Sequence, residues 1–240
     1  MRMISRWGYG LWCWLVFLWA VLTSLLVGVP APRLGQRRAV VRFAARGYLR
    51  ATGTPLVVRG LEHLPAGPCV VVANHASYID GLVMHAALPP RFAFVIKSEM
   101  VKVPLASVLL RRLGSEFVDR VDRHRAAADV RRVVRTASQG QALAVFPEGT
   151  FDERVGVHRF LPGAFTAAAR AGLAVVPAAI RGARGVLPYP GWLPRRGRIE
   201  VEFLPALPPA PAGSRFAANA LRDASRAAIL AALGEPDLAE

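Results

Sequence analysis

The sequence predicts an α/β fold with a mostly parallel central sheet and helices on both faces, preceded by an N-terminal membrane-anchoring helical segment. After Pro55, short runs rich in β-branched residues alternate with longer amphipathic stretches, as in strands joined by crossover helices. Val70-Val71-Val72 is apolar without alternation, which is typical of a strand buried on both faces. A chain of 240 residues with 53% apolar content can bury one such core. We therefore divide it into 1–52, the membrane segment with a basic helix, and 53–240, one α/β domain.

The N-terminal segment predicts a membrane anchor. No charged residue lies between Arg6 and Arg33, and Leu11–Val29 is almost wholly apolar. Such a helix is long enough to cross a hydrocarbon layer of about 30 Å. A cleaved signal peptide is the alternative, because Arg2 and Arg6 form a basic start. The apolar run is long for a signal peptide, which favours a retained anchor.

The next stretch, Gln36–Arg50, carries five arginines between apolar residues and predicts a basic amphipathic helix. Such a helix lies among anionic headgroups or packs on the domain. Its position directly after an apolar segment favours an anionic membrane surface. Five arginines after the anchor against two before it place the domain on the cytoplasmic face by the positive-inside rule.

The remaining elements follow from hydrophobic periodicity and from turn residues. The predicted strands are Leu56–Arg59, Cys69–Ala73, Phe92–Ile96, Glu116–Val118, Ala142–Phe146, Ala174–Ile180 and Ile199–Phe203. The predicted helices are Ser77–Ala87, Pro104–Arg112, Arg123–Ser138, Ala164–Arg170 and Ser214–Leu233. Pro188–Gly197 is a predicted surface loop.

Charge and cysteine content limit the possible partners. The 31 basic and 16 acidic residues give a net charge of +15, which favours a partner that carries phosphates. Because the domain's basic clusters hold few aromatic residues, we expect no nucleic acid. Cys13 and Cys69 are too few and too far apart for a disulfide framework and are expected to be buried thiols.

One turn carries the strongest chemical signal, at the end of the strand Cys69–Ala73. His75 follows this strand, and Asp80 lies about one helical turn further on. A carboxylate bound to one ring nitrogen fixes the tautomer and leaves the other nitrogen free to accept a proton. Ser77 or Asn74 is expected to cap the next helix. Taken alone, such a pair is more often a helix cap or a surface ion pair.

Three other strand ends carry polar residues. Arg120 follows Glu116–Val118, Glu148-Gly149-Thr150 follows Ala142–Phe146, and Arg181 follows Ala174–Ile180. Pro177 predicts an edge or strand-end position for that last segment. Because carboxyl ends of parallel strands share one edge of the sheet, we expect these groups to meet in one crevice.

These four blocks, in this order, resemble the glycerolipid acyltransferase family, typified by bacterial 1-acylglycerol-3-phosphate acyltransferases. The resemblance covers about Leu56–Pro205 and includes the stretch Lys97–Pro104. It implies an acyltransferase domain that moves an acyl group from acyl-CoA or acyl-carrier protein to a lysophospholipid hydroxyl, without a further cofactor. The expected reaction esterifies the sn-2 hydroxyl of 1-acylglycerol 3-phosphate.

The resemblance also implies residue roles. His75 would be the general base and Asp80 its orienting partner, while Arg120 would contact the acceptor phosphate. A surface ion pair with Asp119 or Asp122 is the alternative for Arg120. Residues expected to line the substrate site are Asn74, Ser77, Glu148, Gly149, Thr150 and Arg181. An ordinary turn is the alternative for the Glu148 block.

Two departures concern the acceptor. Many family members have an arginine where Phe151 stands and a lysine where Leu161 stands. Arg159, Arg181 or Arg184 are candidates to replace these contacts; otherwise the acceptor is another lyso-lipid, such as a lyso-ornithine lipid. The remaining histidines show no metal-ligand spacing, so we expect no metal. A non-enzymatic binder of anionic lipid, driven by the +15 charge, is the rival from another class.

Overall fold

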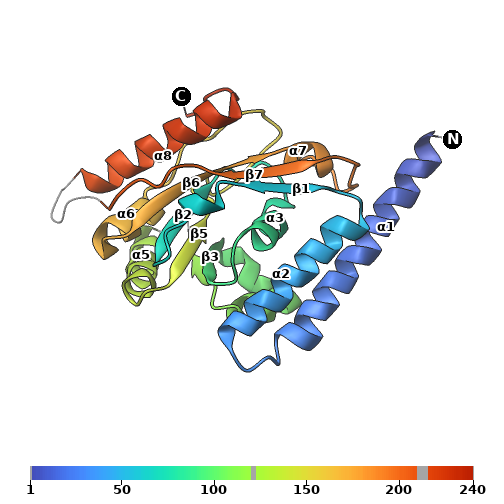
Figure 1. The fold of residues 1–240 in the computed structure, drawn as a ribbon, viewed down its shortest axis with the longest axis horizontal. Helices are drawn as coiled ribbons and strands as arrows, with labels where there is room; N and C mark the ends of the chain where they lie inside the picture. The colour runs from blue at the N-terminus through green and yellow to red at the C-terminus, as the bar shows by residue number, and fades with distance from the viewer. Residues whose placement is uncertain (1, 120–122, 210–215, 240) are drawn as a thin grey trace.

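The computed structural model describes residues 2–119, 123–209 and 216–239, and it confirms the predicted α/β class (Figure 1). A seven-stranded sheet runs in the order β1-β7-β6-β2-β5-β3-β4. Its strands are β1 (Leu56–Arg59), β2 (Cys69–Ala73), β3 (Phe92–Lys97), β4 (Glu116–Val118), β5 (Ala142–Val145), β6 (Ala174–Arg181) and β7 (Ile199–Phe203). Neighbouring strands are parallel except β6 and β7, which pair antiparallel.

Helices cover both faces of the sheet, as predicted. The helices are α1 (Arg2–Thr23), α2 (Leu34–Ala51), α3 (Asp80–Ala87), α4 (Pro104–Arg112), α5 (Arg123–Ser138), α6 (Gly163–Ala171), α7 (Ala183–Val186) and α8 (Ala217–Leu233). A π-helical turn, Ser24–Gly28, continues α1, and 3-10 turns occupy Leu61–His63 and Ser98–Lys102. In Figure 1, α2 and α3 lie on one face, and α5, α6 and α8 lie on the other. The last helix was predicted from Ser214, which lies outside the described residues.

The middle of the sheet is occupied by β2, between β6 and β5. Every residue of β2 is at most 1% exposed. Cys69, Val71 and Ala73 belong to the core under α3, whereas Val70 and Val72 belong to the core under α5, α6 and α8. The apolar run without alternation is therefore explained by burial on both faces.

Pro177 corrects one prediction, because it lies inside β6, a central strand, and not at an edge. The carbonyl of Pro177 accepts from Leu204 N at 2.8 Å, and Val175 exchanges two backbone hydrogen bonds with Leu207. The chain beyond β7 is irregular between these two contacts. A proline lacks a backbone N–H and so cannot donate a hydrogen bond to a neighbouring strand. It is tolerated here because the segment beside it is irregular and needs no regular sheet hydrogen bond at this position.

The N-terminal region forms two packed helices, α1 and α2 (Figure 1). Arg6–Gly28 is long and apolar enough to cross a membrane by length and composition, with a mean hydropathy of 2.1. Many large apolar side chains of α1 are exposed, among them Trp7 (55%), Leu11 (63%) and Leu15 (54%).

The basic helix α2 packs on the α/β domain. The sequence allows this packing as the alternative to a position among anionic lipid headgroups. Arg38 is buried and donates to Leu113 O (3.0 Å) and Arg91 O (2.7 Å), while Arg46 donates to Ala86 O (2.8 Å). These carbonyls lie at helix and loop ends, where intrahelical donors are lacking. Two of the five arginines that predicted contact with lipid headgroups, Arg38 and Arg46, therefore bind backbone carbonyls of the domain and hold α2 against α3 and α4.

Candidate active site

The turn after β2 places His75 at the carboxyl edge of the sheet. α3 begins at Asp80 and not at Ser77 as predicted, so residues 75–79 form a turn between strand and helix. The Asp80 carboxylate holds this turn: Oδ2 accepts from Ala76 N at 2.7 Å and from Ser77 N at 2.8 Å. If the helix began at Ser77 as predicted, the N–H groups of its first turn would have no partner within the helix. The Asp80 carboxylate supplies a partner for two N–H groups of this turn.

The same Asp80 oxygen lies 2.9 Å from Nδ1 of His75. Asp80 is fully buried, and the His75 side chain is 18% exposed. Because a carboxylate faces Nδ1, the neutral imidazole carries its proton there and presents Nε2 as an acceptor. The geometry expected for a base with an orienting carboxylate is therefore present.

Glu148 joins the turn after β5 to the turn after β2. Its Oε1 accepts from His75 N at 2.6 Å and its Oε2 accepts from His158 N at 2.8 Å. Burial, at 5% exposure, raises the pKa of Glu148 to about 7, although the two backbone donors oppose this shift. With both oxygens bound to backbone, Glu148 fixes the position of His75; its contact with an acceptor stays a prediction.

Asn74 and Ser77 also use their side chains within the protein. The Asn74 amide donates to Ile180 O (3.0 Å), and its oxygen accepts from Ile180 N (2.7 Å), so it joins β2 to β6. Ser77 Oγ donates to Leu187 O at 2.6 Å and accepts from Ile79 N at 3.3 Å. Both residues are buried. Neither caps α3 in the way expected for an N-cap side chain, because α3 starts later and their polar groups are used elsewhere.

The other predicted site residues are distributed as follows. Gly149 is buried and adopts φ of 79°, a left-handed conformation that a glycine adopts without strain, while Thr150 is exposed. Arg181, at the end of β6, pairs with Glu202 at 2.8 Å and donates to Ala232 O at 2.6 Å. Its charge is thus matched by a carboxylate of β7. Arg120 lies outside the described residues.

Two phenylalanines enclose the His75 ring. Phe146 is stacked on it with a centroid distance of 4.4 Å and an interplanar angle of 18°. Phe151 approaches at 4.4 Å with its plane tilted by 65°. Phe151, at the position where the resemblance led us to expect an arginine, is therefore in direct contact with the candidate base.

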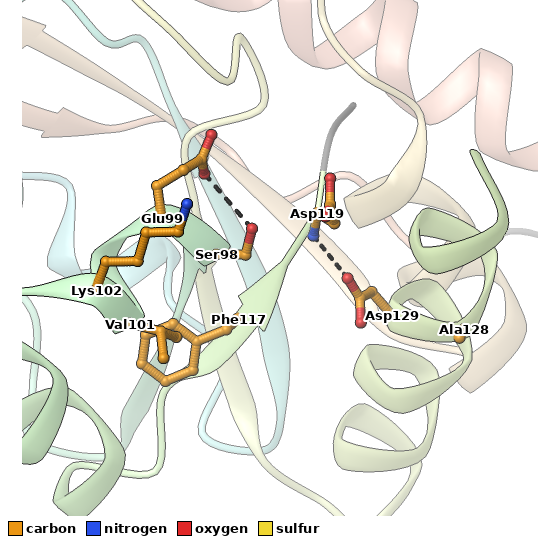
Figure 2. Close-up of a pocket in the computed structure, with 8 residues that line it drawn as sticks. All are labelled: Ser98, Glu99, Val101, Lys102, Phe117, Asp119, Ala128 and Asp129. Atoms are coloured by element: carbon orange, nitrogen blue, oxygen red, sulfur yellow. Dashed lines mark hydrogen bonds between the residues drawn. The ribbon is translucent and has the colours of Figure 1, made fainter. Parts of the chain in front are cut away.

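A cavity of about 590 Å³ lies further along the same edge of the sheet, between the ends of β3 and β4 and the start of α5. Figure 2 shows its lining: Ser98, Glu99, Val101, Lys102, Phe117, Asp119, Ala128 and Asp129. Asp119 N donates to Asp129 at 2.6 Å, which ties β4 to α5. Phe117 and Asp119 of the second sequence block thus line this cavity.

No group of three or more His, Cys, Asp or Glu residues in the described parts of the chain is placed to hold a metal ion. His63 Nδ1 lies 2.7 Å from Phe203 O, and His158 Nε2 lies 3.2 Å from Asp152 Oδ1. His85 packs against Phe94 inside the fold. These contacts account for three histidines without a ligand role.

Sequence reasoning missed the aromatic side chains around His75, namely Phe146, Phe151 and Tyr189. Phe146 directly follows β5 and was counted as an ordinary strand residue. Tyr189 belongs to the loop predicted only as a surface connection. The cavity was partly signalled, since four of its lining residues belong to the stretch Lys97–Pro104.

Comparison with known proteins shows the family of the chain. The profile of the family described as Acyltransferase matches residues 55–181. The chloroplastic 1-acyl-sn-glycerol-3-phosphate acyltransferase of Arabidopsis thaliana is 31% identical over 175 residues, 70% of this chain and 49% of that protein. The 1-acyl-sn-glycerol-3-phosphate acyltransferase of Pseudomonas aeruginosa is 29% identical over 200 residues, 80% of this chain and 75% of that protein. The matches to chloroplastic relatives span about half of those proteins or less.

The fold also matches a solved structure. The crystal structure of the 1-acyl-sn-glycerophosphate acyltransferase from Thermotoga maritima aligns with a TM-score of 0.78. The alignment covers 97% of this chain and 98% of that one, at 21% sequence identity. It shows that the two-helix N-terminal region and the α/β domain together form a known arrangement.

Proposed function

We propose that this chain, which belongs to the Acyltransferase family, transfers a fatty acyl group from a thioester to the hydroxyl of a lysophospholipid. The observation that carries the proposal is the 2.9 Å contact between Asp80 and Nδ1 of His75 at the carboxyl edge of the sheet. Open α/β sheets bind ligands at this edge. The buried Glu148 supports the proposal because it holds the backbone of the base in place.

The chemistry requires one positioned base. Nε2 of His75 takes the proton of the acceptor hydroxyl while the oxygen attacks the thioester carbonyl. The C–O bond forms, the C–S bond breaks, and the proton passes to the leaving thiolate. Asp80 stabilises the imidazolium that exists between these events, and a base of this kind contributes about 10²–10⁴-fold. A thioester already has a good leaving group, so the reaction needs no acyl-enzyme and no bound cofactor.

The acceptor we favour is 1-acylglycerol 3-phosphate, esterified at its sn-2 hydroxyl. The similar proteins of Arabidopsis thaliana and Pseudomonas aeruginosa carry names that specify this acceptor. The cavity beside β4 does not decide the acceptor, because its lining combines one cation, Lys102, with three carboxylates, Glu99, Asp119 and Asp129.

Another lyso-lipid is the second candidate acceptor. The observation that favours it is the position of Phe151, which gives an aromatic contact to His75 where a basic side chain is expected. Arg181 and Arg184 are each paired with a carboxylate, at 2.8 Å and 3.4 Å, so neither is a ready replacement. Leu161 adds no charge.

We also propose that α1 places the enzyme on an anionic membrane, with the domain on the cytoplasmic face. The exposed tryptophan and leucine side chains of α1 suit the interface and the hydrocarbon beneath it. Hydrogen bonds from Tyr9 to Thr52 O and from Trp12 to Ala51 O, each 3.0 Å, hold α1 along α2. A helix held this way enters one leaflet sideways more readily than it spans both.

The decisive experiment is a matrix of donors and acceptors. Full-length protein in mixed vesicles is given acyl-CoA or acyl-carrier protein with 1-acylglycerol 3-phosphate, a lysophosphodiester lipid or a lyso-ornithine lipid, and the ester product is quantified. We expect ester with 1-acylglycerol 3-phosphate, and its loss in His75→Ala. His63→Gln is the matched control, because that histidine lies beside β7, outside the site. Equal ester formation by His75→Ala would reject the proposal, and a preference for an acceptor without a phosphomonoester would establish the second candidate.

A further inference from the structure

The ring of His75 is enclosed more closely than a general base requires. Asp80 occupies Nδ1, Phe146 covers one face of the ring, and Phe151 covers a side. Only 18% of the side chain is exposed. The imidazole ring is therefore flanked by two apolar rings.

Three aromatic side chains form an outer layer over this site; we call Tyr78, Phe151 and Tyr189 the aromatic cover. Their ring centroids lie 4.9 Å apart for Tyr78 and Phe151, 5.6 Å for Phe151 and Tyr189, and 5.8 Å for Tyr78 and Tyr189. They come from three segments: the turn before α3, the turn after β5 and the loop after α7. Tyr78 is 60% exposed and Tyr189 37%, and both rings contact Phe151, which in turn contacts His75.

The loop that carries Tyr189 is held at both ends. Leu187 O accepts from Ser77 Oγ at 2.6 Å, next to the candidate base. Trp192 O accepts from Trp14 Nε1 at 3.1 Å, and the ring of Trp192 lies 5.6 Å from that of Trp7. The loop thus connects the site to the apolar helix α1.

A base that activates a lipid hydroxyl also activates water, which is far more concentrated. The two reactions share one donor: attack by the lipid oxygen gives an ester and a thiol, whereas attack by water gives a free fatty acid and a thiol. Exclusion of water is a recognised way for an enzyme to suppress such a side reaction. Apolar rings at the base exclude water yet accommodate a hydrocarbon chain.

We propose that the aromatic cover excludes water from Nε2 of His75 and so directs the acyl group to the lipid hydroxyl. The inference rests on the proposed acyl transfer and adds to it a set of residues that determine which nucleophile reacts. Tyr78, Phe151 and Tyr189 act here through the access they leave to His75, so they are positioning residues.

The test measures two products from one reaction. Purified full-length protein in vesicles receives acyl-CoA and a lysophospholipid, and total thiol release and ester are quantified. Their difference divided by the total thiol release is the hydrolysed fraction. In Phe151→Ala and in Tyr189→Ala we expect this fraction to rise about tenfold, with total thiol release within about threefold of wild type. Tyr189→Phe, which keeps the ring, should retain the wild-type fraction.

Controls separate the possible failures. Phe216→Ala removes a 76% exposed aromatic ring beside α8, on the other face of the sheet, and should change neither product. Should Phe151→Ala melt far below wild type, Tyr189→Ala carries the test, because its side chain is already partly exposed. An unchanged hydrolysed fraction, or ester and acid falling together, overturns the inference while the proposed function stands. Thiol release without any ester in wild type overturns both.

Discussion

Two histidines at opposite ends of one segment show how surroundings decide the role of a residue. His75 precedes α3, faces the buried carboxylate of Asp80 and keeps part of its ring accessible. His85 lies in the last turn of α3, packed against Phe94 at a centroid distance of 4.0 Å. Burial, with a smaller effect from the positive charge of Arg38, lowers the pKa of His85 to about 4.

The difference teaches what a base needs beyond an imidazole. A carboxylate partner supports the imidazolium that exists during proton transfer, and an open side admits the substrate. A ring beside a buried arginine stays neutral and contributes packing. The segment therefore contains one histidine suited to catalysis and one suited to the core.

The largest expected effect contrasts the two histidines directly. His75→Ala should lower kcat/KM by about 10²–10⁴-fold, because the positioned base is lost, with little change in melting temperature. His85→Leu keeps the packing against Phe94 and should retain most activity. Steady-state kinetics and thermal melting of both variants check this. Comparable losses of kcat/KM in the two would show that the contrast between them is false.

A smaller effect is expected when only the partner of His75 changes. Asp80→Asn should lower kcat by about 10²-fold, because a neutral amide stabilises an imidazolium less than a carboxylate does. The amide oxygen can still accept from Ala76 N and Ser77 N, so the turn should fold. The pH profile of kcat distinguishes this role from a structural one. If Asp80→Asn kept the wild-type kcat but melted at a lower temperature, Asp80 would stabilise the turn and have no role in catalysis.

Glu148 gives the surroundings of His75 a pH signature of their own. Its pKa is raised from 4.5 to about 7, so between these values the unfolded chain has lost a proton that the native protein retains. Stability from this group is fully present below pH 4.5 and is lost as pH rises through about 7, by about 3 kcal/mol. Glu148→Gln should lack this decrease. Urea unfolding of both proteins across pH 4.5–7.5 measures the free energy of unfolding at each pH. If this free energy changed with pH in the same way in both proteins, the raised pKa of Glu148 would be wrong.

His85 should show the opposite and smaller dependence. Its pKa is lowered from 6.5 to about 4, so as pH falls the unfolded chain binds a proton that the native protein does not. Stability is fully present above pH 6.5 and is lost as pH falls toward 4, by about 1 kcal/mol after allowance for the accessible part of the ring. His85→Leu should remove this loss in the same urea series. A wild-type slope in the variant would assign the effect to another group.

Local patterns predicted most of the fold. Bounds of β1, β2, β4, β7, α4 and α5 agree with the predicted ones, because each depends on neighbouring residues and on turn signals. Pro177 was misplaced because its local meaning, an unavailable N–H, depends on what the adjacent segment offers. The start of α3 was misplaced for a similar reason, since Asp80 and not Ser77 binds the free N–H groups.

By itself, the sequence determined that His75 and Asp80 would meet, because five residues of turn and helix start leave little freedom between them. It also determined the buried strand β2 and the apolar helix α1. Only the tertiary structure decided that Glu148 would bind His75 N, that Arg38 would enter the domain and that Phe146 and Phe151 would pack against the His75 ring. Such contacts join segments far apart in the chain. They depend on strand order and helix packing, which local periodicity does not encode.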